Sequence, residues 1–301
     1  MKGEKGKTAS AQVARYKTKG TGWIYVFITI LALICFLPMW LLFTTSITDS
    51  KELLLEGVRL FPQNVSWEAY RYLLTTGKST IVQSYAITIY STLVGTVLAV
   101  IMTAAAGYAL SCPHLKGTSF FALYFFITML FSGGMVPWYM INKKLGLDNN
   151  FWALVVPSLM FSPYNMFLVR NYMKGLPISM AESARIDGAS EFVIAWKIFI
   201  PLSVPVLATV TLFYALGYWN SWWNAVMLVE DKELFPLQYM LVKIRSNLKA
   251  MQVSGAASSI RVPTQPVQNA ITLATIGPIL LLYPFLQRYF IKGIVIGAVK
   301  G

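Results

Sequence analysis

Six long apolar stretches, separated by polar segments, dominate the chain. A transmembrane helix needs about 20 consecutive apolar residues, and each stretch is near that length or longer. No Asp, Glu, Lys or Arg lies clearly inside any of them. The pattern predicts an all-α, polytopic membrane protein with six transmembrane helices, at residues 23–45, 82–110, 118–141, 151–170, 202–229 and 267–290.

Composition supports a membrane protein independently. Of the 301 residues, 56% are apolar and 12% are charged, and the mean hydropathy is +0.58. A soluble domain usually has about 25% charged residues, so this chain has too little polar surface for a soluble protein of its size. The net charge of +13 does not indicate nucleic acid binding, because the Lys and Arg residues are spread among loop ends.

Basic residues predict the orientation. A basic tail, residues 1–22, precedes the first stretch, and the positive-inside rule places it in the cytoplasm. Six spans then put both termini on that side, together with the polar segment at residues 171–201. A cleaved signal peptide is the alternative for the first stretch. It is less favoured because the stretch is longer than a signal-peptide core and ends in Phe43-Thr44-Thr45 without a small-x-small site.

The polar segment carries the signals of two short helices. Ser179 and Glu182 have the spacing of a capping box, which starts a helix. Gly188 suits the left-handed residue that ends it. Ser190 can cap a second helix that leads to Ile198, Ile200 and Pro201. The expected structure is a helix, a sharp turn and another helix.

The sequence contains no recognisable set of catalytic residues. Gly77-Lys78-Ser79-Thr80 copies the end of a phosphate-binding loop, but Tyr72 stands where that loop needs a glycine. His114 is the one histidine and has no catalytic partners in the sequence, and Cys35 and Cys112 show no metal-ligand spacing. We therefore expect a non-catalytic chain that binds no metal and no cofactor itself. The charge-free spans also disfavour proton-coupled transport.

The polar segment resembles a known motif. Glu182-Ser183-Ala184, then Gly188, Ile198 and Ile200-Pro201, is similar in spacing to the EAA loop of ABC-importer permeases, with Ser183 for Ala and Ile200 for Leu. The chain resembles the maltose-type second permeases of carbohydrate importers, and within them the oligosaccharide and polysaccharide-fragment branch. Further residues carry this likeness: Gly134, Pro137, Gly146, Leu147, the string 186–189 and the ending 290–301.

The resemblance implies a fold and a set of partners. It implies a type I ABC-importer permease architecture, with one transmembrane domain at residues 23–301 and a cytoplasmic coupling loop at 171–201. The expected partners are a homologous second permease, an ATPase dimer that binds ATP and Mg, an extracytoplasmic solute-binding protein and a carbohydrate, in a bacterial cell membrane. The implied ATPase-coupling residues are Ser179, Glu182, Ser183, Ala184, Arg185, Asp187 and Gly188.

Two alternatives accompany this hypothesis. Glu182 would merely cap its helix if the loop has no coupling role. The chain as a whole would then be a secondary transporter without ATP, or an interaction subunit that recruits some other cytoplasmic protein. Whether or not the loop couples to an ATPase, we expect Arg185 and Asp187 to be exposed.

Aromatic and amide side chains at the end of the fifth stretch are candidates for a substrate pathway. Aromatic rings can stack on sugars while amides bond hydroxyls. The interpretation places Asn220 and Asn224 one helical turn apart, on a face with Gly217. The alternative is an aromatic belt at the outer interface, with the Asn residues bonding neighbouring helices. The pathway candidates are Tyr218, Trp219, Asn220, Trp223 and Asn224.

Overall fold

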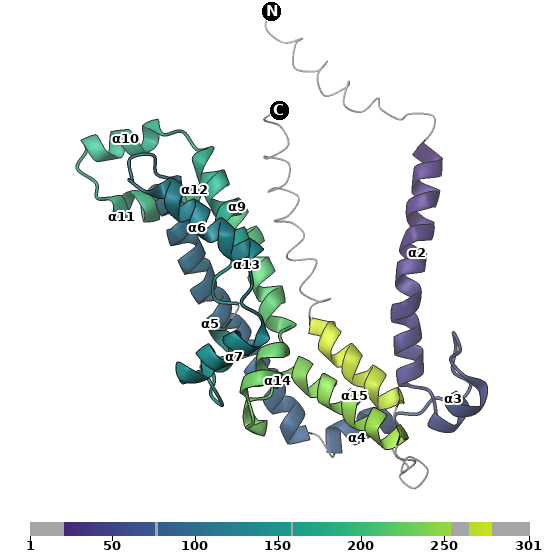
Figure 1. Ribbon diagram of the computed structural model, residues 1–301. Coiled ribbons are helices and arrows are strands. Elements are labelled where there is room, and N and C mark those ends of the chain that lie inside the picture. Colours follow the sequence, from purple (N-terminus) through teal and green to yellow (C-terminus); the bar gives the residue numbers. More distant parts are fainter. Residues whose placement is uncertain (1–20, 76–77, 158, 254–264, 279–301) are drawn as a thin grey trace, which may run out of the picture. The chain divides into compact units, whose positions relative to one another are not determined.

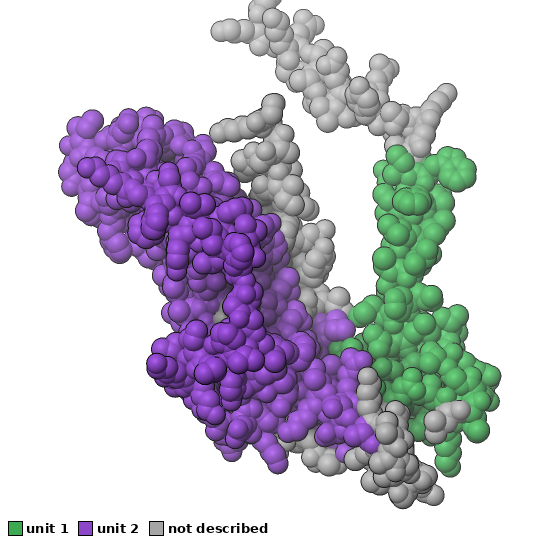
Figure 2. Space-filling model, viewed as in Figure 1, with its two compact units in different colours: residues 1–71, 262–273 green, residues 72–261, 274–301 purple. Residues whose placement is uncertain are grey.

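The computed structural model describes residues 21–75, 78–157, 159–253 and 265–278. These ranges are mostly helical (Figure 1), and the β contact among them is an isolated bridge between Thr48 and Val65. They divide into two compact units (Figure 2). The first comprises residues 1–71 and 262–273, and the second comprises residues 72–261 and 274–301.

The first unit contains a long helix, α2 (Thr21–Ser46), which confirms the helix predicted for the first stretch and is long and apolar enough to cross a membrane. Large apolar side chains such as Trp23, Phe27 and Leu33 are exposed along it. An uncharged helix of this length with apolar side chains all round suits a lipid environment. This helix therefore needs lipid or another protein around it.

A buried carboxylate organises the loop that follows α3 (Ser50–Glu56). The two oxygens of Glu52 accept hydrogen bonds from the backbone N–H groups of Gln63, at 2.9 Å, and Asn64, at 2.7 Å. The bond from Gln63 is the main cause that holds the pKa of the Glu52 carboxyl below its ordinary value. The ionised side chain thus ties the returning chain to α3.

The second unit is built around α5 (Lys78–Ser111), which confirms the helix predicted for the second stretch and is also long and apolar enough to cross a membrane. It packs against α9 (Pro163–Lys174) and α13 (Val204–Trp219). Two glycines allow close approach: a Cβ on Gly95 would come within 2.7 Å of the Tyr218 ring, and one on Gly107 would come 2.8 Å from Val169. The core of the unit therefore lies along α5.

The remaining predicted spans differ from straight helices. The third stretch forms α6 (Thr118–Leu130) and α7 (Met135–Lys144), bent by 117° at a break that contains Gly134, whose φ is +86°. The fourth contains α8 (Trp152–Val155), a break at Pro157 and then α9, with Pro163 at its start. A proline lacks the N–H that a continuing helix would use, which explains the second break.

The fifth and sixth stretches also depart from the prediction. The fifth is interrupted after α13, and α14 (Trp223–Leu228) begins separately. Residues 265–278 of the sixth are helical, and its remainder, 279–290, lies outside the described residues. Of the described helices, two are long and apolar enough to cross a membrane, or up to four if each bent pair is one span. The described residues also form helices outside the predicted stretches, among them α4 (Glu68–Thr75), η2 (Lys232–Leu234) and α15 (Leu237–Val253).

Candidate functional site

The first helix of the polar segment, α10 (Ser179–Ile186), begins without the predicted capping box. Ile178 already has helical dihedrals, with φ −65° and ψ −28°, and no side chain caps the helix. Its carbonyl accepts from the N–H groups of Ala181, at 3.0 Å, and Glu182, at 3.1 Å. Ser179 is therefore inside the helix, one position too late to cap it, and this part of the prediction is wrong.

The end of α10 confirms the prediction for Gly188, whose φ is +81°. The N–H of Ala189 bonds the carbonyl of Ala184 at 2.9 Å, and the N–H of Gly188 bonds that of Arg185 at 3.0 Å. This pair of bonds is a Schellman motif, in which a left-handed residue reverses the chain and satisfies the last carbonyls of the helix. Gly188 thus makes the turn.

The second helix also starts as predicted. The Ser190 side chain accepts from the N–H of Val193 at 3.4 Å and begins α11 (Glu191–Ile194). The helix continues through a π-helical turn, η1 (Ala195–Phe199), and ends in α12 (Ile200–Leu202). An 82° bend then leads into α13.

The polar segment is anchored on one side and free on the other. Ala181 and Ile194 are buried in the core with α5 and α9, whereas Glu182, Ser183 and Asp187 are exposed. Ile186, at the tip, has 86% of its surface exposed. Ile178, Met180 and Phe192 of the same segment are exposed as well, an apolar surface that the sequence analysis did not predict.

Arg185 differs from the expectation, because it is half-buried and paired. Its Nε lies 2.6 Å from Oε1 of Glu191, and Nη2 lies 3.4 Å from Oε2. Nη2 also lies 3.2 Å from Nδ1 of His114, whose Nε2 is 3.3 Å from Oε1 of Glu191. The hydroxyl of Tyr108 donates to Oε2 of Glu191 at 2.7 Å. Sequence reasoning missed this cluster of four, which we call the Glu191 clamp.

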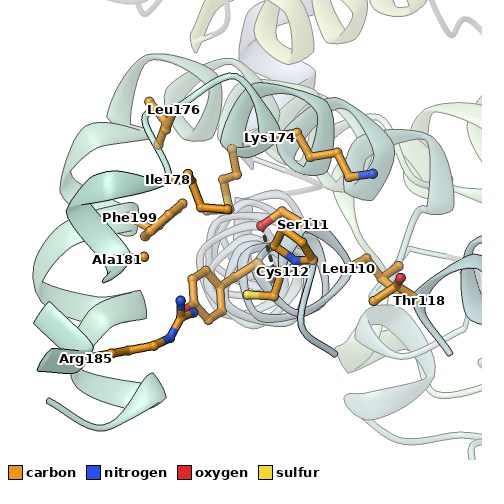
Figure 3. A pocket seen from close by; sticks show the side chains of 13 residues that line it. Leu110, Ser111, Cys112, Thr118, Lys174, Leu176, Ile178, Ala181, Arg185 and Phe199 are labelled. Atoms are coloured by element: carbon orange, nitrogen blue, oxygen red, sulfur yellow. Dashed lines mark hydrogen bonds between the residues drawn. The ribbon is translucent and has the colours of Figure 1, made fainter. Parts of the chain in front are cut away.

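Figure 3 shows a cavity beside the clamp, with Arg185 and Cys112 at its wall. Its volume is about 290 Å³, and it lies between the end of α5, α9, α10 and Phe199. Burial raises the pKa of the Cys112 thiol, which keeps the thiol protonated.

Ligand atoms of Cys112, His114 and Glu191 come within 4.8 Å of one another, a grouping that the linear spacing did not predict. The guanidinium of Arg185 is already paired with the Glu191 carboxylate, and the positive charge of Arg185 disfavours a metal cation at this place.

The pathway candidates separate into two groups. Tyr218, Trp219 and Asn224 are buried and donate to the backbone carbonyls of Val155 (2.9 Å), Thr275 (3.2 Å) and Pro157 (2.7 Å). Asn220 and Trp223 are exposed. Asn220 ends α13, its amide donates to Leu216 at 2.8 Å, and its carbonyl accepts from Gln238 at 3.0 Å.

The predicted common face of Asn220 and Asn224 is wrong. The helix α13 ends at Trp219, so Asn220 is the residue just after it, whereas Asn224 lies in the separate helix α14. The expectation assumed a continuous helix through this region.

Comparisons with known proteins place this architecture. The family model of the binding-protein-dependent transport system inner membrane component matches residues 115–296. Protein LplC of Bacillus subtilis (strain 168) is 37% identical over 270 residues, which cover 89% of this chain and 90% of that protein. The polygalacturonan/rhamnogalacturonan transport system permease protein YtcP of the same strain is 35% identical over 280 residues, which cover 92% and 97%.

A solved structure shares the fold. The crystal structure of a bacterial ABC transporter involved in the import of the acidic polysaccharide alginate contains a chain with a TM-score of 0.79 and 33% identity. The match covers 88% of this chain and 94% of that one. By its family match and these similarities, the chain belongs to the inner membrane components of binding-protein-dependent transport systems.

Proposed function

We propose that this chain is the permease subunit of an ATP-binding-cassette importer for oligosaccharides, and that it forms half of the translocation pathway. The observation that carries the proposal is the polar segment: a short helix, a Schellman turn at Gly188 and a second helix, with an exposed outer side. Proteins of this family are non-catalytic membrane subunits. ATP and Mg would bind to the ATPase subunits, which pair with this chain and a homologous second permease.

The polar segment is the proposed coupling loop, at residues 171–201. Closure of the ATPase dimer would move α10, and chain continuity would carry the movement to α9 on one side and α13 on the other. Glu182 offers an exposed carboxylate to the ATPase, Ala184 permits close docking and Gly188 makes the turn. Arg185 serves within the loop through its pair with Glu191.

The membrane arrangement belongs to the same proposal. We infer six spans in a bacterial cell membrane, at the six apolar stretches of the sequence, of which the first two form the long apolar helices α2 and α5. The basic tail 1–22 supports cytoplasmic termini, and residues 23–301 act as one permease domain. A solute-binding protein would deliver the cargo on the opposite side.

Recruitment of the ATPase tests the coupling role. The tagged full chain, solubilised in mild detergent, should co-purify with a second permease and an ATPase that carries a phosphate-binding loop. Glu182→Ala should keep the second permease but lose at least fivefold of the ATPase, because its exposed carboxylate is the proposed contact. Asp148→Ala, which removes another exposed carboxylate, is the control and should retain both. Absence of an ATPase from the wild-type complex would refute the proposal.

The proposed cargo is an oligosaccharide released from a polysaccharide. One relative is named for polygalacturonan and rhamnogalacturonan transport, and the solved structure for alginate import. Within this chain Asn220 and Trp223 are the pathway candidates that remain exposed, with 41% of the Trp223 surface free. An exposed amide can bind a sugar hydroxyl, and an exposed aromatic ring can stack on the apolar face of a sugar.

The two asparagines should respond differently to substitution. Asn220→Ala should lower uptake of labelled oligogalacturonides several-fold with little change in the melting temperature, because its side chain and its bonds to Leu216 and Gln238 are exposed. Asn224→Ala should destabilise the chain by about 1–3 kcal/mol, because the buried Pro157 carbonyl loses its donor. Uptake assays in cells and thermal unfolding in detergent measure the two effects. Wild-type uptake by Asn220→Ala would remove that residue from the pathway.

A further inference from the structure

The Glu191 clamp joins segments that are far apart in sequence. Tyr108 is 83 residues before Glu191, and His114 is 71 residues before Arg185. Tyr108 belongs to α5, and His114 to the turn between α5 and α6, whereas Arg185 belongs to α10 and Glu191 to α11. One carboxylate therefore connects both helices of the coupling loop to each other and to α5.

The clamp differs in kind from the other contacts between these elements. Ala181 and Ile194 pack against the core through apolar contacts, which are non-directional. The bonds to Glu191 are directional and charge-assisted, and those from Arg185 Nε and Tyr108 are 2.6 and 2.7 Å long. A neutral His114 with its proton on Nε2 satisfies both of its contacts, since Nε2 then donates to Glu191 and Nδ1 accepts from Arg185. The clamp thus fixes the orientation of α10 and α11 relative to the end of α5.

The clamp links the coupling loop to α5, a helix that is not next to the loop in the chain. In the chain, α9 precedes the helices of the coupling loop and α13 follows them, so movement of the loop reaches these two helices directly. The helix α5 is separated from the loop in the chain by α6, α7, α8 and α9, although it packs against α9 and α13. A directional contact at the end of α5 is therefore a separate route to the longest helix of this unit.

We propose that Glu191 is a positioning residue that transmits movement of the coupling loop to α5. The inference rests on the proposed coupling function, because it assumes that an ATPase moves α10. Glu191 would not contact the ATPase itself. Tyr108 and Arg185 would act through the same carboxylate, one from each side.

The contact itself can be tested on the purified chain without any partner. Trypsin cleaves after Arg185, and the ion pair holds that side chain against Glu191. Glu191→Gln keeps the shape but removes the charge, and should raise the rate of cleavage after Arg185 at least threefold. Tyr108→Phe should raise it less, and the double variant should match Glu191→Gln, because both changes act through one carboxylate. Glu182→Gln, with an exposed carboxylate three residues before Arg185, is the control and should leave the rate unchanged.

Transmission is tested on the complex with the ATPase and the second permease in lipid nanodiscs. ATP, Mg and vanadate should change hydrogen exchange in the α5 amides near residue 108 in the wild type. With Glu191→Gln the amount of bound ATPase should stay the same, while this change falls at least threefold. With Glu182→Gln the bound ATPase itself should fall.

The outcomes separate the two proposals. Unchanged trypsin cleavage in Glu191→Gln overturns the clamp, whatever the ATPase does. Loss of bound ATPase in Glu191→Gln overturns the positioning role, because Glu191 would then be a docking residue. A full exchange response in that variant, with ATPase bound, also overturns it. Failure of the wild type to bind any ATPase refutes the coupling function, and the trypsin result would still stand as a test of the contact.

Discussion

Gly188→Val is expected to reduce uptake at least tenfold while the protein remains in the membrane in near-normal amount. The glycine has φ +81°, a conformation that costs an ordinary residue about 1–2 kcal/mol and a β-branched one more. No atom lies within 4 Å of a Cβ built there, so the effect comes from the backbone and not from a clash. Loss of the Schellman turn would re-aim α10 and α11, and the ATPase would lose its docking geometry.

Two further substitutions at this position isolate the backbone effect. Asparagine tolerates the left-handed region, so Gly188→Asn should keep most of the uptake. The uptake by Gly188→Ala should lie between that of Gly188→Asn and that of Gly188→Val. Uptake of labelled oligogalacturonides, normalised to the amount in the membrane by immunoblot, measures the series. Normal uptake by Gly188→Val would exclude a coupling role for the turn.

Gly95→Ala is expected to destabilise the second unit by overpacking. The added Cβ would lie within 2.7 Å of the Tyr218 ring, which is 2% exposed and cannot move without breaking its bond to the Val155 carbonyl. Overpacking of a tight core usually costs about 1–3 kcal/mol. The melting temperature in detergent should fall, and Gly95→Val should fall further.

Gly217→Ala supplies a matched control on α13, next to Tyr218. Its Cβ would meet only Leu159 Cδ2 at 3.6 Å, an ordinary contact, so its melting temperature should stay close to that of the wild type. Tyr218→Leu should make Gly95→Ala less harmful than it is alone, since the smaller side chain frees space. If Gly95→Ala melts like the wild type, the close approach of α5 and α13 is not as described.

Local signals explain why the turn in the polar segment could be predicted. The dihedral demand at Gly188 and the hydroxyl of Ser190 act within a few residues, and both predictions were confirmed. The capping box failed although it is equally local, because Ile178 takes helical dihedrals and starts the helix earlier. A sequence pattern shows that a cap is available, but the path of the preceding chain decides whether it is used.

Hydropathy predicted which stretches are apolar but not how they bend. Residues 118–141 were predicted as one span, yet the helix breaks between Leu130 and Met135, at a segment that contains Gly134 with φ +86°. Hydropathy does not report backbone dihedrals, so it could not predict this break. The clamp was beyond prediction for another reason. Its members lie up to 83 residues apart, and only the packing of α5 against the polar segment brings them together.

The π-helical turn at Ala195–Phe199 gives the fixed spacing of the motif a geometric meaning. Nine residues separate Gly188 from Ile198, and the wide turn accommodates one residue more than a regular helix would over the same rise. Deleting one residue there would return the turn to regular α-helix and leave α12 nearly in place. Inserting a further residue would rotate everything downstream by about 100°, since each residue of a helix turns by that angle. The chain between Gly188 and Ile198 should therefore tolerate a one-residue deletion in the wide turn better than a one-residue insertion.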